Sequence, residues 1–197
     1  MVRGKKLVIG VGGNIGSGKT TVAKIFRSMG AQYISADRIG WEVLQDIKPD
    51  LRRHFGNGVF IGGRVDREKL RNVVFSNPGN LRVLNQLSHP RLLKRIYKRL
   101  TNIRSGMVVI DAALLFFWSD LLKKIDYPIL VKSRFKLKRM RALKKGIPPE
   151  VFEQIIRFQQ SESQIAKKAK FVITNNGTLW QLKKQCQKIF KELKDDC

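Results

Sequence analysis

Short apolar runs of strand length alternate with amphipathic helical patterns along most of this chain. The first run, residues 6–11, is apolar on both faces, as in a strand buried between two layers. Comparable runs follow at residues 32–35, 107–110, 127–131 and 171–174. Because helical patterns separate these runs, the sequence predicts an α/β fold with a five-stranded, mainly parallel sheet flanked by helices.

The first of the flanking helices is predicted from residue 20 onward. Val22, Ile25, Phe26 and Met29 recur at helical spacing, and Gly30 is a natural stop after the last turn. A last helix is predicted from about residue 178, after a polar turn. Both helices present one apolar stripe, as expected of helices that cover a sheet.

A long section between the second and third strand-like runs, residues 46–105, has a different character. It begins with glycine-rich turns around residues 55–58 and 61–63 and continues with helical patterns. One helix there has an apolar stripe opposite a basic one. The apolar positions are Leu92, Leu93, Ile96, Leu100 and Ile103. We expect this section to be a helical substrate-binding insertion within a single domain that spans residues 1–197.

The net charge of the chain indicates which kinds of ligand it attracts. Forty Lys and Arg face fifteen Asp and Glu, a net charge of +25 that attracts nucleotides, polyphosphorylated metabolites and nucleic acids. No apolar run approaches the roughly 20 residues that cross a bilayer, so no membrane partner is expected. Cys186 and Cys197 form neither a disulfide framework nor a metal-ligand spacing, which favours a reducing cytoplasm.

A glycine-rich segment joins the first predicted strand to the first predicted helix. It fits the phosphate-binding pattern G-x-x-x-x-G-K-[ST] in full and in the required context. Its backbone N–H groups and the helix N-terminus are expected to hold the phosphates of ATP, with Lys19 at the β- and γ-phosphates and Thr20 at Mg²⁺. The predicted ATP-binding residues of this segment are Gly13, Asn14, Ile15, Gly16, Ser17, Gly18, Lys19, Thr20 and Thr21.

Two aspartates follow predicted strands, at the sheet edge where ligands of this fold class bind. Asp37 is placed to accept the proton of an acceptor hydroxyl, which would make it a catalytic residue. The alternative is that Asp37 caps a helix starting at Arg38. Asp111 can act on Mg²⁺ at the end of its strand, although capping of the following segment explains an aspartate there equally well.

Residues 132–145 carry eight cations and no acid. A solvated basic face is the ordinary explanation of such a run. In a phosphoryl transferase, a mobile cationic helix can instead close over the triphosphate and stabilise its charge. We therefore expect a lid over about residues 132–148, with Arg139 as its central catalytic cation. Leu137, Met140 and Leu143 lie near one face of this helix.

Further motifs give the chain a resemblance to the dephospho-CoA kinases, which use ATP to phosphorylate the ribose 3′-hydroxyl of dephospho-CoA. The resemblance covers nearly the whole chain. Its motifs lie, in family order and spacing, at residues 8–20, 35–43, 55–56, 65–75, 89–90, 111–115, 137–139 and 172–177. The resemblance implies Asp37 as general base, Arg67 and His89 in acceptor binding, Arg139 on the ATP phosphates and Asn175 beside the adenine.

Two of these residues have simpler explanations. Pro90 suits the first turn of a helix, with His89 beside its cap, and Arg67 suits the protein surface. The chain also departs from the family pattern at several positions. The departures are Asn14 for a glycine, Ser35 for an aspartate, Ala113 for a proline, Phe117 for a glutamate, Leu143 for a lid arginine and Lys170 for an aspartate. They leave the expected chemistry and Asp37 intact but affect the acceptor site and the lid.

The expected function is ATP-dependent phosphorylation of dephospho-CoA, giving CoA and ADP, with Mg²⁺ as cofactor. A kinase of nucleosides or nucleoside monophosphates is the nearest alternative. A nucleic-acid-associated P-loop ATPase is a further one, supported by the charge of +25 without an RNA-binding motif. Nucleic acid is thus not a required partner, although the charge permits non-specific binding.

Overall fold

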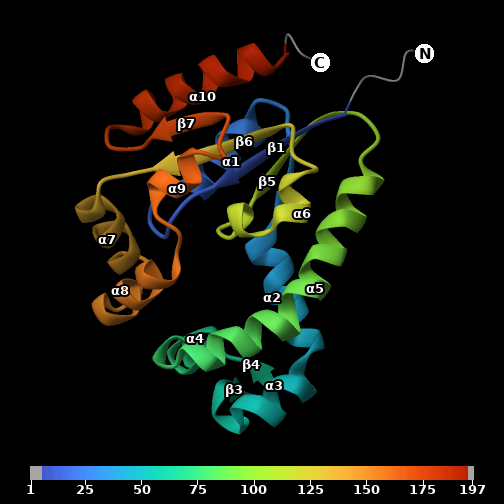
Figure 1. Cartoon of the computed structure of the whole chain (residues 1–197), viewed down its shortest axis with the longest axis vertical. Helices are drawn as coiled ribbons and strands as arrows, with labels where there is room; N and C mark the ends of the chain where they lie inside the picture. The colour runs from blue at the N-terminus through green and yellow to red at the C-terminus, as the bar shows by residue number, and fades with distance from the viewer. Residues whose placement is uncertain (1–5, 195–197) are drawn as a thin grey trace.

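The computed structural model describes residues 6–194 and contains the parallel sheet that the sequence predicts (Figure 1). Its strands pair in the order β2-β5-β1-β6-β7, with every neighbouring pair parallel. The strands are β1 (Lys6–Gly12), β2 (Gln32–Ser35), β5 (Gly106–Asp111), β6 (Tyr127–Lys132) and β7 (Phe171–Thr174). All five predicted strands are therefore confirmed, and β1 lies at the centre of the sheet.

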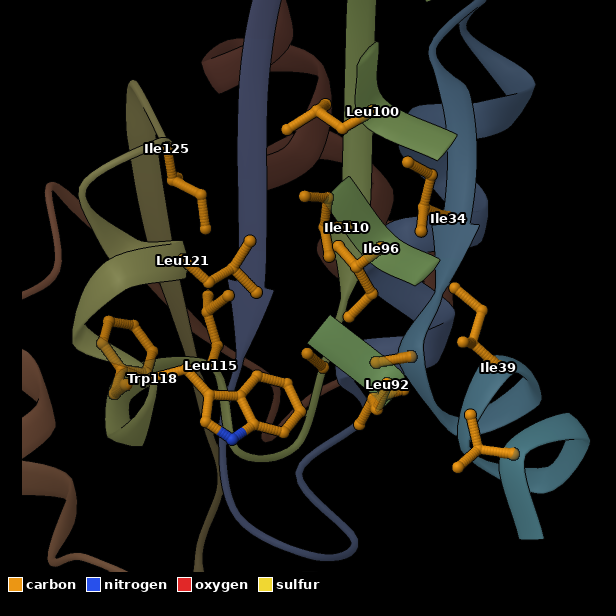
Figure 2. Close-up of a cluster of buried hydrophobic side chains, with 14 of the residues drawn as sticks. Ile34, Ile39, Leu92, Ile96, Leu100, Ile110, Leu115, Trp118, Leu121 and Ile125 are labelled. Carbon is orange, nitrogen blue, oxygen red and sulfur yellow. The ribbon is translucent and has the colours of Figure 1, made fainter. Parts of the chain in front are cut away.

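Helices cover both faces of the sheet, which explains why β1 is apolar throughout. Leu7 and Ile9 of β1 pack on one side with α1 (Lys19–Ser28) and α10 (Leu179–Lys194). Val8 points to the opposite cluster, which Figure 2 shows in detail. Gly10 also faces that cluster, and a Cβ at this position would collide with the side chains of Ile125 and Leu115. The two-sided burial fixes the register of this central strand.

The second cluster joins several segments that are far apart in the sequence (Figure 2). Ile39 comes from α2 (Ala36–Asp46), and Ile96 comes from α5 (Pro78–Asn102). Leu115 and Leu121 come from η2 (Leu115–Phe117) and α6 (Ser119–Leu122), and all four side chains are fully buried. This cluster attaches the long central section of the chain to the sheet.

The rest of that central section forms a small substructure at one end of the molecule (Figure 1). Its elements are α3 (Lys48–Phe55), η1 (Asn57–Val59), β3 (Phe60–Ile61), β4 (Arg64–Val65) and α4 (Arg67–Ser76). Strands β3 and β4 pair antiparallel, which the sequence analysis did not anticipate.

Helix α5 corrects the expectation that Pro90 begins a helix. Pro90 instead lies inside one continuous helix whose N-cap is Asn77. A proline at an interior position removes a backbone hydrogen bond and favours a bend. Figure 1 shows α5 changing direction partway along its length. Burial of Leu92, Ile96 and Leu100 on one side of the helix stabilises this arrangement.

The basic segment between β6 and β7 forms three helices, α7 (Phe135–Leu143), α8 (Pro149–Phe158) and α9 (Glu162–Ala166). Helix α7 does not bury the apolar residues that share a face in its sequence, since Met140 and Leu143 are exposed. Its buried residues are Lys138 and Ala142. The ammonium group of Lys138 lies 2.7 Å from a carboxylate oxygen of Glu162 on α9, and this ion pair compensates for the burial of its charge. Over the described residues no helix is both long and apolar enough to cross a bilayer.

Candidate active site

The predicted phosphate loop lies between β1 and α1, at the carboxyl edge of the sheet. Gly13, Gly16 and Gly18 have φ angles of 147°, 74° and 96°. A Cβ at Gly13 would collide with the carbonyl oxygen of Val131, and one at Gly16 would collide with that of Lys138. These glycines are required both by backbone conformation and by the close approach of neighbouring chain segments.

Asn14, which stands where the family has a second glycine, is compatible with the loop. Between residues 6 and 194 no residue other than glycine has a positive φ, so Asn14 adopts an ordinary backbone conformation. Its side chain is 7% exposed and donates a hydrogen bond of 3.3 Å to the backbone oxygen of Gln160. The amide N–H of Ile15 donates to Oε1 of Gln159 at 2.9 Å. The segment after α8 thus contacts the tip of the loop.

Two side chains brace the loop from the other side. Nδ2 of Asn175 donates to the backbone oxygen of Ser17 at 2.8 Å, in a buried position. The Arg141 guanidinium donates to the backbone oxygens of Gly16 at 3.4 Å and Asn175 at 3.0 Å, and to Oγ of Ser133 at 3.1 Å. Burial lowers the pKa of Arg141 from its usual range. Asn175 and Arg141 therefore hold the backbone of the loop in shape.

Asp111 lies at the end of β5 and is 1% exposed. Burial raises the pKa of this carboxyl, and the nearby charge of Asp37 adds to that effect. The nearby hydroxyl of Thr20 and the charge of Lys19 oppose it by lowering the pKa. The structure therefore brings Asp111, Asp37, Lys19 and Thr20 within electrostatic reach of one another. Helix capping does not explain Asp111, because η2 has Leu114 at its N-cap.

Asp37 sits in the first turn of α2, but it does not cap that helix. The N-cap is Ser35, whose Oγ accepts a hydrogen bond of 3.3 Å from the backbone N–H of Arg38. The capping explanation of Asp37 is therefore wrong. Ser35 replaces the family aspartate at this position and supplies the cap.

Asp37, Lys19 and Thr20 all line one cavity of about 660 Å³. The cavity extends from the phosphate loop to an apolar recess between α2, α4 and α5. The apolar residues of this recess are Trp41, Leu44, Leu70, Val74, Phe75, Leu84 and Leu92. Such a cavity, polar at one end and apolar over most of its wall, is typical of small-molecule sites.

The two predicted acceptor-binding residues both line this cavity. The Arg67 guanidinium lies 4.1 Å from the ring centroid of Trp41, which holds its charge over the apolar recess. Nδ1 of His89 accepts a hydrogen bond of 3.3 Å from Nε1 of Trp118. Burial lowers the pKa of His89, so its imidazole is neutral at pH 7. Since Nδ1 accepts, Nε2 carries the proton.

The predicted lid reaches the cavity through residues other than its predicted central cation. Ala142, Lys145 and Ile147 of the lid line the cavity, and Ile155 and Gln159 at the following helix α8 line it as well. Arg139 is half-buried and is not among the lining residues. On the same helix, Arg141 donates to the backbone of the phosphate loop instead.

Helix α8 also contacts the insertion on the far side of the cavity. The rings of Phe75 on α4 and Phe158 on α8 lie 6.2 Å apart, centroid to centroid. Figure 1 shows α8 next to α4, so the cavity lies between these two parts of the chain.

Several residues of the site were not found from the sequence. The tryptophans Trp41 and Trp118 carried a weak signal, since each lies close to a family motif. Arg141 is one of eight cations in residues 132–145, and the sequence alone does not single it out. Nothing in a linear pattern shows that Gln159 reaches Ile15, because the two positions are 144 residues apart.

The departures from the family pattern differ in their consequences. Ala113 lines the cavity and leaves room where the family has a proline. Phe117 and Leu143 are exposed at the surface. The ammonium of Lys170 lies 4.0 Å from the ring centroid of Tyr127, at the start of β6. Apart from Ala113, these three departures lie away from the lining of the cavity.

Comparison with known proteins agrees with this geometry. A family model described as Dephospho-CoA kinase matches residues 7–181. A dephospho-CoA kinase of Aquifex aeolicus is 33% identical over 95% of this chain and 98% of its own length. One from Borreliella burgdorferi is 34% identical over 92% of each chain.

Solved structures extend the comparison to the fold. A crystal structure from Thermus thermophilus, 29% identical, superposes with a TM-score of 0.78 and covers 96% of this chain and 98% of its own. A shikimate kinase of Acinetobacter baumannii, at 15% identity and a TM-score of 0.55, covers 96% and 94% and shares the fold alone. On the family match and the curated relatives, this chain belongs to the dephospho-CoA kinase family.

Proposed function

We propose that this protein transfers the γ-phosphoryl group of ATP to the ribose 3′-hydroxyl of dephospho-CoA, giving CoA and ADP. The observation that carries the proposal is one continuous cavity. It joins the phosphate-loop residues Lys19 and Thr20 to Asp37 and then to the apolar recess between α2, α4 and α5. A donor site alone would serve an ATPase, whereas a kinase needs both compartments in contact.

The donor half follows from the phosphate loop. The backbone of the loop and the N-terminus of α1 hold the phosphates, and Lys19 places its charge at the β- and γ-oxygens. Asn175 and Arg141 keep the loop in its binding shape. Arg139 is proposed to swing toward the triphosphate when the lid closes, and Asn175 is proposed to border the adenine. Lys145 is a further cation of the lid that lines the cavity.

Thr20 and Asp111 fit a magnesium ion. Within the described part of the chain, Oδ1 of Asp111 is buried without a hydrogen-bond partner, which is costly unless a ligand satisfies it. Hydroxyl and carboxylate oxygens are the donors that Mg²⁺ prefers. Thr20 and Asp111 would hold the ion beside the phosphates, where it would supply positive charge that offsets the charge developing during transfer.

The acceptor half is assigned to the apolar recess and its polar rim. Asp37 takes the proton of the ribose hydroxyl as that oxygen attacks the γ-phosphorus. Arg67 and the Nε2–H of His89 are the cation and the donor that orient the acceptor, which carries a pyrophosphate and a long uncharged arm. Residues 46–105 act as the acceptor-binding insertion, and residues 132–148 act as the lid of the single domain.

A nucleic-acid-binding function is less well supported than the charge of the chain suggests. Three arginines on the basic side of α5 pair with acidic residues of α2 and α3. Arg99 lies 2.6 Å from Glu42, Arg91 lies 3.7 Å from Asp50, and Arg95 pairs with Asp46. These intramolecular pairs neutralise part of the basic charge of α5.

We propose that the protein works in a reducing cytoplasm. Cys186 is a free, fully buried thiol on α10, and burial raises its pKa to about 12. Such a thiol is a packing residue rather than a reactive one. Cys197 lies outside the described residues.

The test is ADP release across a panel of acceptors at fixed MgATP. The panel contains dephospho-CoA, nucleoside monophosphates, nucleosides and RNA. The proposal expects dephospho-CoA to give the largest kcat/KM. Activity with another acceptor and none with dephospho-CoA would overturn the acceptor assignment and leave the ATP site intact.

A further inference from the structure

Tyr33 places a hydroxyl group beside the buried carboxylate of Asp111. The phenolic oxygen of Tyr33 lies 3.0 Å from Oδ2 of Asp111, and the hydroxyl donates. Tyr33 belongs to β2, the edge strand of the sheet, and is half-buried. Neither the phosphate-loop pattern nor the acceptor assignment uses this residue.

The register of the sheet explains the contact. Tyr33 is aligned with Val109, and Ser35 is aligned with Asp111, on the neighbouring parallel strands β2 and β5. Because side chains alternate between faces, Tyr33 and Asp111 point to the same face of the sheet, one step apart diagonally. An aromatic side chain is long enough to bridge a diagonal pair. The contact is therefore set by backbone pairing and not by a flexible loop.

The two oxygens of Asp111 have different surroundings. Oδ2 is held by Tyr33, whereas Oδ1 is buried with no hydrogen-bond partner among the described residues. The terminal torsion of an aspartate is broad, so a carboxylate without an anchor has no fixed direction. A hydrogen bond to one oxygen fixes the plane of the group and leaves the other oxygen available.

We propose that Tyr33 is a positioning residue for the magnesium site. Its hydrogen bond to Oδ2 orients Asp111 so that Oδ1, together with the hydroxyl of Thr20, faces the ion of the MgATP complex. The inference rests on the proposed magnesium role of Asp111. A partner that orients a metal-ligating group typically contributes tenfold to hundredfold in metal affinity or activity.

A purely structural role of Tyr33 is the competing explanation. Its ring packs against the hydrophobic cluster that Leu7 and Ile9 of β1 form with α1 and α10. The Arg27 guanidinium lies 6.0 Å from the centroid of that ring. Tyr33→Phe keeps the ring and removes only the hydroxyl, so it separates packing from positioning. Tyr97→Phe is the matched control, because Tyr97 lies on α5 and does not line the cavity.

The experiment measures metal binding without any acceptor. Mn²⁺ replaces Mg²⁺ as the probe, and its electron paramagnetic resonance signal is titrated against protein and ATP. We expect Tyr33→Phe to weaken Mn²⁺ binding to the protein–ATP complex about tenfold. Tyr97→Phe should bind Mn²⁺ as the parent protein does. ATP binding in a chelator and the thermal midpoint should be nearly unchanged in Tyr33→Phe.

A double variant decides whether Tyr33 acts through Asp111. If it does, Tyr33→Phe has no further effect on Mn²⁺ binding in an Asp111→Asn background. Unchanged Mn²⁺ binding in Tyr33→Phe, or an additive loss in the double variant, would overturn the inference. Because dephospho-CoA is absent from the titration, a wrong acceptor assignment cannot produce either result.

Discussion

Asp37 lies in the first turn of α2, but its carboxylate does not cap the helix. Ser35 caps α2 in its place, and Asp37 lines the cavity next to Lys19 and Thr20. A carboxylate that faces a substrate cavity and stabilises no helix end is a candidate for chemistry. The same reasoning applies to Asp111, whose burial costs stability unless a ligand compensates for it.

Replacing Asp37 by Asn should lower kcat with dephospho-CoA by about 10²–10⁴-fold, because the acceptor hydroxyl loses its proton acceptor. ATP binding should change little, since the phosphate loop is untouched. Steady-state kinetics and ATP titration measure the two effects. Unchanged turnover of Asp37→Asn would show that another group takes the proton.

His89 predicts a pH dependence of stability. Burial lowers its pKa, so below about pH 6.5, its usual value, the unfolded chain binds more protons at this residue than the folded chain does. The contribution of neutral His89 is therefore complete above that pH and is lost as the pH falls toward the folded pKa. We expect the free energy of unfolding to decrease less between pH 7 and pH 5 in His89→Gln than in the parent protein.

Urea unfolding at several pH values measures this difference. His54→Gln is the matched control, because His54 is the other histidine of the chain and is exposed. An identical pH dependence of the parent protein and His89→Gln would contradict a buried, neutral imidazole at this position.

At the scale of elements, helix α7 is part of the wall that shapes the phosphate loop. Its Lys138 backbone oxygen approaches Gly16, and its Arg141 side chain bonds the loop and the segment after β7. Helix α7 of the lid is therefore in direct contact with the phosphate loop. Mutations on two faces of α7 should separate bracing of the loop from catalysis.

Arg141→Met should lower the free energy of unfolding by about 1–3 kcal/mol, because it leaves partly buried carbonyl oxygens without their donor. It should also weaken ATP binding. Arg139→Met should leave stability within about 0.5 kcal/mol and lower kcat, since Arg139 is proposed to act only when the lid closes. Denaturant titration and kinetics compare the two variants. The reverse pattern would exchange the roles assigned to these arginines.

The sheet and its main helices were predictable because apolar periodicity reports burial directly. The phosphate loop was predictable because its glycines are required by backbone geometry. The position of Pro90 was not predictable, since packing of α5 overrides the local preference of proline for a helix start. Contacts such as Tyr33 with Asp111 depend on strand order and register, which a single sequence does not contain.

At the scale of the whole molecule, the cavity is closed by contact between two separate parts of the chain. The Phe75–Phe158 contact joins α4 to α8 across it. This contact should help to enclose the acceptor and exclude water from the reaction.

Phe158→Ala should raise the KM for dephospho-CoA about twofold to tenfold, which corresponds to the loss of one aromatic pair. Phe135→Ala is the control, since the ring of Phe135 on α7 meets that of Phe152 on α8 and not a ring of the insertion. Kinetics with varied dephospho-CoA measure both variants. An equal effect of the two substitutions would show that the contact across the cavity has no special role.

The central claim is that the cavity holds ATP and dephospho-CoA together for phosphoryl transfer. The most direct measurement incubates the purified protein with MgATP and dephospho-CoA and analyses the product by mass spectrometry and phosphorus NMR. The account predicts one added phosphoryl group, on the ribose 3′-hydroxyl, together with ADP. It also predicts almost no product from Asp37→Asn. An unmodified acceptor, under conditions where a nucleoside or nucleoside monophosphate is phosphorylated, would contradict it.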